Sequence, residues 1–266
     1  MRPPEDILQR IVETKREEVE ALRGSRSELR DRAEAAPPPR DFAGALAGRG
    51  AVAVIAEIKR RSPGAGAIRM DLDPIGLGPM YESGGAAALS VLTDREYFGG
   101  SLEDLSTVRD LVNIPILRKD FVIDESQVFE ARAAGADAIL LIVRILDDER
   151  LRSLRTVAEE LGMSVLVEAH DGAEVQRGLD TGARLLGINN RNLQTFEARI
   201  DVTLSLADRV PSDVALVSES GIHTAADVRS VGEVGVDAVL VGESLLRQED
   251  PGEGVTALAG QEKASR

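Results

Sequence analysis

The chain has 266 residues, 43% of them apolar, which is enough for one large domain with a sizeable hydrophobic core. Its formal net charge of −14 argues against a nucleic-acid partner, because such a partner requires a basic surface. The lack of cysteine excludes disulfides and thiolate metal sites, and we expect a cytoplasmic protein with neither a secretory signal nor the roughly 18–20 apolar residues of a membrane span.

Residues 5–23 have the pattern of an amphipathic helix. One stripe of this helix, at spacings of three and four, consists of Ile7, Leu8, Ile11, Val12, Lys15, Val19 and Leu22. We interpret it as a surface helix that docks by this stripe. The prolines of "AAPPPR" (35–40) then end helical structure, so residues 1–45 are predicted to form an N-terminal helical extension.

Short apolar runs, separated by helical patterns, recur from residue 51 onward. Continuous apolar runs bounded by turns are typical of parallel strands buried on both faces. The runs cover 51–59, 87–94, 114–121, 138–143, 164–169, 185–190, 215–220 and 238–243. Eight such units in about 200 residues predict a (β/α)₈ TIM barrel over 51–250, with a C-terminal tail over 251–266, all in a single domain. A doubly wound sheet is the alternative.

Polar and charged residues end nearly every run, whereas the first halves of the runs carry almost none. Barrel enzymes place their active sites at the carboxyl ends of the strands, so we expect a site there. The strand-end residues are Glu57, Lys59, Thr93, Asp94, Lys119, Asp120, Arg144, Glu168, Asn189, Arg191, Glu219, Ser220, Gly242 and Glu243.

Two segments with glycine, "SESGI" (218–222) and "LVGESLL" (240–246), end the last two runs. Glycine lets the backbone approach a ligand closely, and "GESLL" is typical of a short helix whose first amides face an anion. Phosphate sites recur at this place in barrels. Lys59 and Ser62, in "AEIKRRSP" (56–63), belong to the first unit, which closes the barrel against the eighth. We therefore expect a phosphate site here.

Several segments together resemble the indole-3-glycerol-phosphate synthase family of tryptophan biosynthesis. They are "IAEIKRRSP", "ALSVLTDREYFGGSLEDL", "ILRKDF", "LVEAH", "GINNRNL", "VSESGI" and "VGESLL". The resemblance runs in order from the N-terminal helix to about residue 250. The chain departs from the family at Gly76, Gly78 and Pro79, where a member usually has an uninterrupted helix, so we expect a shortened or distorted helix there.

The resemblance implies a carboxy-lyase that converts 1-(2-carboxyphenylamino)-1-deoxyribulose 5-phosphate into indole glycerol phosphate, with loss of CO₂ and water. Lys119 matches the general acid, and lysine, with a reference pKa of about 10.4, arrives protonated. Glu168 matches the second proton-transfer group. Glu57 matches a carboxylate that orients Lys119 or assists proton transfer, and the division of roles between the two glutamates stays open. Lys59 and Asn189 complete the implied catalytic set.

The resemblance also implies binding residues. Those for the substrate are Ser62, Phe98, Phe121, Leu140, Arg191, Leu193, Glu219 and Ser220. Those for the phosphate are Lys59, Ser62, Gly221, Gly242, Glu243 and Ser244. The two phenylalanines both follow strand ends, where they could contact the aromatic ring of the substrate instead of only filling the core.

Other interpretations remain for the same residues. Glu57 and Lys59 could form only a structural ion pair, and Glu168 could be a solvated strand end. Two rival functions are another phosphate-binding barrel, such as a phosphosugar isomerase, and a barrel that binds a small molecule without catalysis. The isomerase would lack the lysine–glutamate set, and the binding protein would need no proton-transfer groups.

We expect a phosphorylated small molecule as the sole ligand, with no metal or organic cofactor, and a monomer or weak homodimer. The only histidines, His170 and His223, have no metal-ligand spacing, and we assign neither as acid or base. Asp120 is interpreted as structural. Because Gly64 and Gly66 permit unusual backbone conformations, residues 60–69 are predicted to form a lid that orders over bound substrate.

Overall fold

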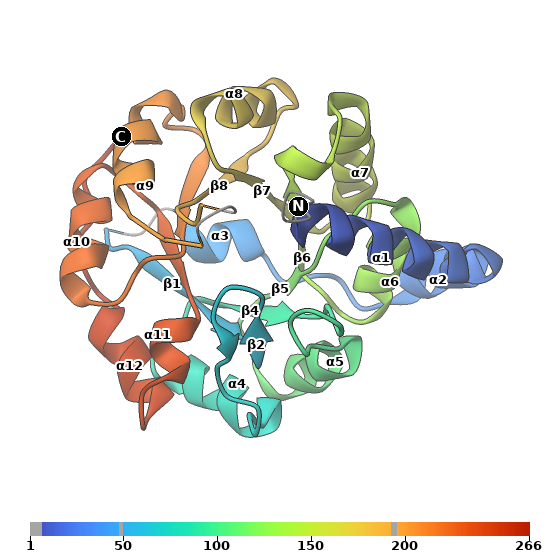
Figure 1. The fold of residues 1–266 in the computed structure, drawn as a ribbon, viewed down its shortest axis with the longest axis horizontal. Coiled ribbons are helices and arrows are strands. Elements are labelled where there is room, and N and C mark those ends of the chain that lie inside the picture. Colours follow the sequence, from blue (N-terminus) through green and yellow to red (C-terminus); the bar gives the residue numbers. More distant parts are fainter. Residues whose placement is uncertain (1–6, 48–49, 193–195) are drawn as a thin grey trace, which may run out of the picture.

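The computed structural model describes residues 7–47, 50–192 and 196–266, which form a closed parallel barrel ringed by helices (Figure 1). The strands are β1 (Ala53–Ile58), β4 (Ala88–Leu92), β5 (Ile116–Lys119), β6 (Ala138–Ile142), β7 (Ser164–Ala169), β8 (Leu185–Asn189), β9 (Ala215–Glu219) and β10 (Ala238–Val241). Each falls within one predicted run. Because β1 pairs with both β4 and β10, the sheet closes, and the TIM barrel is confirmed over the doubly wound alternative.

Helices follow the strands along the chain. They are α4 (Pro74–Ser83), α5 (Leu102–Leu111), α6 (Glu125–Ala133), α7 (Asp148–Glu160), α8 (Gly172–Asp180), α9 (Asp201–Leu206), α10 (Ala225–Glu233), α11 (Glu243–Leu246) and α12 (Pro251–Leu258), with the 3-10 turns η2 (Val143–Ile145) and η3 (Ala207–Arg209). Local sequence sets many of the starts: Asp124 and Thr224 form capping boxes at α6 and α10. None of the helices within the described ranges is long and apolar enough to cross a membrane.

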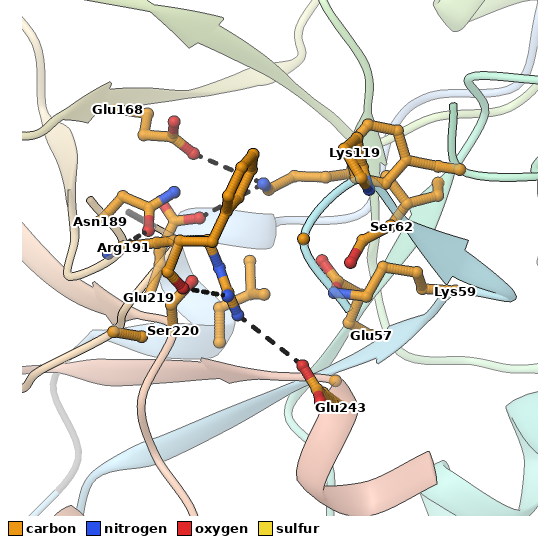
Figure 2. A pocket seen from close by; sticks show the side chains of 18 of the residues that line it. Glu57, Lys59, Ser62, Lys119, Glu168, Asn189, Arg191, Glu219, Ser220 and Glu243 are labelled. Atoms are coloured by element: carbon orange, nitrogen blue, oxygen red, sulfur yellow. Dashed lines mark hydrogen bonds and ion pairs between the residues drawn. The ribbon is translucent and has the colours of Figure 1, made fainter. Parts of the chain in front are cut away.

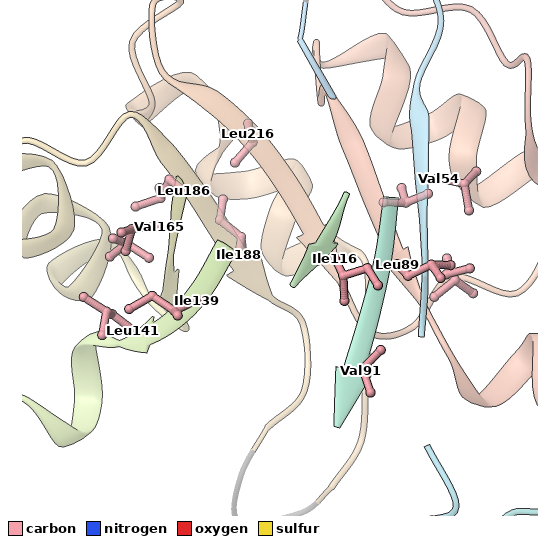
Figure 3. Close-up of a cluster of buried hydrophobic side chains, with 14 of the residues drawn as sticks. Val54, Leu89, Val91, Ile116, Ile139, Leu141, Val165, Leu186, Ile188 and Leu216 are labelled. Atoms are coloured by element: carbon pink, nitrogen blue, oxygen red, sulfur yellow. The ribbon is translucent and has the colours of Figure 1, made fainter. Parts of the chain in front are cut away.

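Strand alternation divides the core into two layers. Outward-facing residues such as Val54, Ile116 and Leu186 pack beneath the helices (Figure 3). Inward-facing residues such as Ile55 and Leu117 fill the barrel interior. The next inward position along each strand reaches the carboxyl-terminal mouth, so the alternation itself selects which strand-end side chains converge there.

The N-terminal extension covers both ends of the barrel. Helix α1 (Ile7–Leu22) begins over the mouth and runs outward to the turn η1 (Arg23–Ser25) and α2 (Arg26–Ala35), which packs on α6 (Figure 1). The predicted stripe does dock, but Lys15 on that stripe is only 1% exposed. At the opposite end, α3 (Phe42–Leu46) closes the barrel with Phe42 and Leu46.

Helix α4 is as long as α5, so the predicted shortening over Gly76, Gly78 and Pro79 does not occur. Asp73 caps the helix, and Pro74 occupies its first turn. Gly78 has a packing role, because a Cβ there would lie 2.9 Å from Cγ1 of Val108 on α5. The close approach of the two helices accounts for this glycine, and Pro79 is accommodated within the helix.

The segment after residue 250 continues the packing of the barrel. Helix α12 lies against α4, and Glu262 forms an isolated bridge with Ala51 at the start of the barrel. Lys263 and Arg266 pair with Asp237, which precedes β10. These contacts fix the C-terminal residues at the end of the barrel opposite the mouth.

Candidate active site

A cavity of about 340 Å³ opens at the carboxyl-terminal mouth of the barrel, a volume typical of small-molecule sites. Every residue to which the sequence analysis gave a catalytic or binding role lines this cavity, except Leu193, which lies outside the described ranges. The strand-end residues Thr93, Asp94 and Arg144 do not line it. The lining residues that the sequence predicted are Glu57, Lys59, Ser62, Phe98, Lys119, Phe121, Leu140, Glu168, Asn189, Arg191, Glu219, Ser220, Gly221, Gly242, Glu243 and Ser244. Ten of them are labelled in Figure 2.

The ammonium group of Lys119 lies at the centre of the charged side chains. Its Nζ is 3.4 Å from Oε2 of Glu168 and 3.5 Å from Oε2 of Glu219 (Figure 2). Burial alone would lower the pKa of Lys119, but the neighbouring carboxyl groups, above all that of Glu168, raise it above its ordinary value. Lys119 is therefore an ammonium at neutral pH, the form that can donate a proton.

Glu57 and Lys59 project from the end of β1 and form an ion pair beside Lys119. Burial would raise the pKa of Glu57, but the charges of Lys59 and Lys119 lower it, so this carboxylate is ionised. Gly242 makes space for it, because a Cβ there would lie 2.5 Å from Oε1 of Glu57. The ion pair of the structural interpretation thus exists, and both of its members also face the cavity.

Two buried glutamates near Lys119 differ in protonation. Burial and the neighbouring charge of Glu168 raise the pKa of Glu219 to about 8. The pKa of Glu168 is lowered instead, because Lys119 and His170 outweigh the effect of burial. Gly187 leaves room for Glu219, since a Cβ at that position would overlap its Oε1. At neutral pH this pair therefore has one ionised and one protonated carboxyl group, an arrangement suited to acid–base chemistry.

Arg191 is held by three contacts at the mouth. Its backbone N–H donates to Oδ1 of Asn189 at 3.0 Å, and its Nη1 donates to the carbonyl oxygen of Phe196 at 2.8 Å. Its Nη2 lies 3.8 Å from Oε2 of Glu243 (Figure 2). Phe196 has a φ of 61°, which is rare for a bulky residue. A fixed guanidinium of this kind can bind a carboxylate or a phosphate.

An apolar slot forms the side of the cavity near α1. The rings of Phe98 and Phe121 lie with centroids 5.9 Å apart and a tilt of 39°, and Leu140 lies below in the barrel. Helix α1 adds three residues that the sequence analysis did not assign to the site: Ile7, Leu8 and Ile11. The sequence did contain a signal for this docking, namely Lys15 on an otherwise apolar stripe. A lysine that is buried by docking requires acidic partners, and Asp94 and Asp120 at the mouth provide them.

The opposite side of the cavity presents backbone and hydroxyl groups. Ser220 and Gly221 both have positive φ, at 66° and 79°, where the chain turns after β9. Helix α11 starts immediately after Gly242, and its first-turn amides have no partner within the helix. Ser244 donates its hydroxyl to the carbonyl oxygen of Ile222, which ties the two turns together. This side of the cavity can bind an anion.

Residues 60–69 include a small antiparallel hairpin, β2 (Arg61–Ser62) and β3 (Gly66–Ala67), at the edge of the cavity. Arg60 pairs with Asp104 at 2.5 and 3.1 Å, and Arg61 donates to backbone carbonyls at residues 95 and 96. These arginines bind the hairpin to the barrel, whereas Ser62 and Gly64 line the cavity. Closure of this segment over substrate stays a prediction.

Two acidic residues of the mouth support structure. Asp120 accepts from Arg118 and Thr93, and it lies 3.0 Å from Nζ of Lys15. Asp94 lies 2.9 Å from the same nitrogen. Together they hold α1 over the slot. Among the described residues, no group of three or more His, Asp or Glu side chains is arranged to hold a metal ion.

The fold and the site define a β/α-barrel enzyme whose mouth combines a buried lysine ammonium, paired carboxyl groups, an aromatic slot and a place for an anion. A family model described as indole-3-glycerol phosphate synthase matches residues 8–258, and the chain belongs to this family.

Proteins of that name support the assignment. The protein from Laribacter hongkongensis is 50% identical over 253 residues, which cover 93% of this chain and 96% of that protein. The protein from an Azoarcus species is 50% identical over 262 residues, which cover 96% and 99% of the two chains.

Solved structures of other barrels share the fold alone. Thiamine phosphate pyrophosphorylase from Pyrococcus furiosus has a TM-score of 0.59 at 18% identity, covering 78% of this chain and 93% of that chain. The 3-hexulose-6-phosphate synthase from Salmonella typhimurium has a TM-score of 0.62 at 15% identity, covering 78% and 96%.

Proposed function

We propose that Lys119 is the general acid and Glu168 the second proton-transfer group of indole glycerol phosphate synthesis at this mouth. The reaction itself, a carboxy-lyase step of tryptophan biosynthesis, follows from the family to which the chain belongs. One observation carries the assignment of roles. The Lys119 ammonium lies between two carboxyl groups that differ in protonation, and it faces an aromatic slot.

The chemistry assigns each proton a residue. The ring carbon that bears the carboxylate attacks the keto carbon of the ribulose chain, and Lys119 donates a proton to the keto oxygen as it becomes a hydroxyl. The carboxylate leaves as CO₂, with its bonding electrons returned to the ring. Glu168, as an ionised carboxylate, takes the proton lost from the neighbouring carbon and gives it to the hydroxyl, which leaves as water; we assign both transfers to this residue. The ionised Glu57 favours the positively charged form of Lys119.

The binding residues divide by the part of the substrate they contact. The aromatic ring would occupy the slot of Phe98, Phe121 and Leu140, and the carboxylate would face Arg191 and Lys59. Asn189 and Glu219 would hydrogen-bond the hydroxyls of the ribulose chain, with Ser220 beside them. The phosphate would lie against Ser62, Gly221 and Gly242, together with the backbone at Glu243 and Ser244.

Product fluorescence tests these roles. Purified protein and substrate should generate the fluorescence of an indole, and Lys119→Met should lower kcat by on the order of 10²-fold or more while circular dichroism stays unchanged. Glu168→Gln should slow product formation in single-turnover traces with substrate still bound. Near-native turnover of Lys119→Met would overturn its assignment. A defect in Glu57→Gln without one in Glu168→Gln would reverse the two carboxylates.

A phosphosugar isomerase is not favoured, because it would have no use for the Phe98–Phe121 slot or for the set of two lysines and two ionised glutamates. We also propose that the enzyme acts in the cytoplasm as a monomer or weak homodimer of single-domain chains, without a metal or organic cofactor. The cavity is compatible with a monomer, because a single chain supplies all of its predicted groups within the described ranges.

A further inference from the structure

His170 lies directly after β7, where strand alternation places its side chain on the same side as Glu168. The imidazole is 5% exposed. Its Nε2 is 3.4 Å from Oε1 of Glu168, and its Nδ1 is 3.1 Å from Oε2 of Glu174. The backbone N–H of His170 donates to the same Glu174 oxygen at 2.8 Å. The ring therefore bridges the reaction site and the first turn of α8.

Glu174 determines which nitrogen of the ring carries hydrogen. It accepts from Nε of Arg144 at 2.6 Å, and these contacts with His170 and Arg144 outweigh burial and lower the pKa of Glu174 to about 2. An ionised carboxylate can only accept, so Nδ1 of His170 must be protonated. Nε2, the other ring nitrogen, faces Oε1 of Glu168 and has no hydrogen-bond partner within the described residues.

A lone pair and an ionised carboxylate oxygen repel each other at this separation. The contact is favourable when one proton lies between them, either on Nε2 as an imidazolium or on Oε1 as a carboxylic acid. The remaining charged groups around the ring are Arg144 on η2, Asp171 at the cap of α8, and Lys119 beyond Glu168. Arg209 on η3 approaches the same loop at Gly172.

We propose that His170 is a positioning residue that orients Glu168 and holds at Nε2 the proton that Glu168 exchanges with substrate. The inference rests on the proposed role of Glu168. A proton that Glu168 takes from substrate passes from Oε1 to Nε2, which leaves a carboxylate and an imidazolium. It returns to Oε1 when Glu168 donates to the departing hydroxyl, so no proton is gained or lost.

Substitutions that separate the two ring contacts test the proposal. Asn at position 170 can mimic Nδ1 but has no atom at Nε2, whereas Gln can mimic Nε2 without titrating. We expect His170→Asn to lower kcat about tenfold or more with KM changed less than about threefold. Its acid limb should move upward in pH, because His170 no longer favours the ionised form of Glu168. Glu174→Gln should move the limb in the same direction.

Two further variants make the outcome specific. His170→Gln should recover part of kcat but not the wild-type pH profile. Asp180→Asn is the matched control, since it removes a carboxylate from the exposed end of the same helix, where Asp180 accepts a hydrogen bond from Gln176. The proposal is overturned if His170→Asn keeps the wild-type acid limb, or if Asp180→Asn shifts it equally.

A spectroscopic measurement on the wild-type enzyme is independent of activity. The chain has two histidines, so ¹⁵N spectra with His223→Gln as an assignment aid isolate His170. We expect the tautomer with hydrogen on Nδ1, and a neutral ring with hydrogen on Nε2 would refute the proposal. If Glu168→Gln were as active as the wild type, the proposed role of Glu168 would be wrong, whereas the tautomer of His170 would still test its contacts with Glu168 and Glu174.

Discussion

Removal of the Lys15 ammonium should loosen helix α1 from the mouth. The Lys15 side chain is 1% exposed, and its Nζ lies 2.9 Å from Asp94 and 3.0 Å from Asp120, which are 0% and 2% exposed. Lys15→Met keeps a similar stem and removes the charge. Loss of one member of a buried ion pair typically costs about 3–5 kcal/mol, because the partner charges stay buried.

The protein can limit that cost by releasing α1. Asp94 and Asp120 would then regain water, and the loss of stability could not exceed the docking free energy of the helix. If α1 stays docked, about 3–5 kcal/mol corresponds to a Tm lower by roughly 6–20 °C for a chain of this size. If α1 detaches, the Tm changes less, but Ile7, Leu8 and Ile11 leave the cavity wall and KM rises.

Thermal unfolding together with hydrogen exchange over residues 7–22 distinguishes these two outcomes. Arg16→Met is the matched control, because it removes one cation from an exposed position of the same helix. The reasoning is refuted if Lys15→Met has the Tm, the exchange rates in α1 and the KM of the wild type.

Four further outcomes follow from the geometry of the mouth. Gly242→Ala would place its Cβ 2.5 Å from Glu57, so kcat should fall on the order of 10²-fold with little change in Tm. Folded Glu219 keeps its proton to about pH 8, whereas the unfolded chain loses it near 4.5, so this contribution to stability is lost as pH rises through that interval. Glu219→Gln should therefore reduce the decrease in unfolding free energy between pH 4.5 and about 8, as measured by urea titrations. Gly64→Ala, whose Cβ would lie 2.7 Å from the Phe196 ring, should alter turnover and its viscosity dependence more than Tm. Exhaustive chelation should leave activity intact, and a loss restored by one added metal would contradict the absence of a cofactor.

Much of the barrel could be predicted from the sequence because its strands are buried on both faces. Continuous apolar runs mark such strands, and the polar residue that ends each run marks the mouth. Glu57, Lys119 and Glu168 were found in this way. The prediction for the helix over 74–83 was wrong. Glycine in a helical pattern indicates a break, but in the structure Val108 occupies the space that a side chain at position 78 would need.

The contacts at His170 were only partly accessible to sequence reasoning. Its spacing of four residues from Glu174 is local and could have been noticed, because Asp171 caps the intervening turn. Its approach to Glu168 also follows from strand alternation. The absence of a metal-ligand spacing instead led to the exclusion of His170 from acid–base roles, although a ring can act through a neighbouring carboxylate.

The order of residue types along the chain by itself determined the eight strands, the position of the mouth and the polar groups at the strand ends. The spacing of apolar residues and the length of apolar runs are local properties of the sequence. Only the tertiary structure decided that Glu168 is ionised while Glu219 is protonated, and that α1 covers the slot through a buried Lys15. Those properties depend on through-space distances between charges from strands and helices far apart in sequence, and electrostatic energy in a buried site varies steeply with such distances.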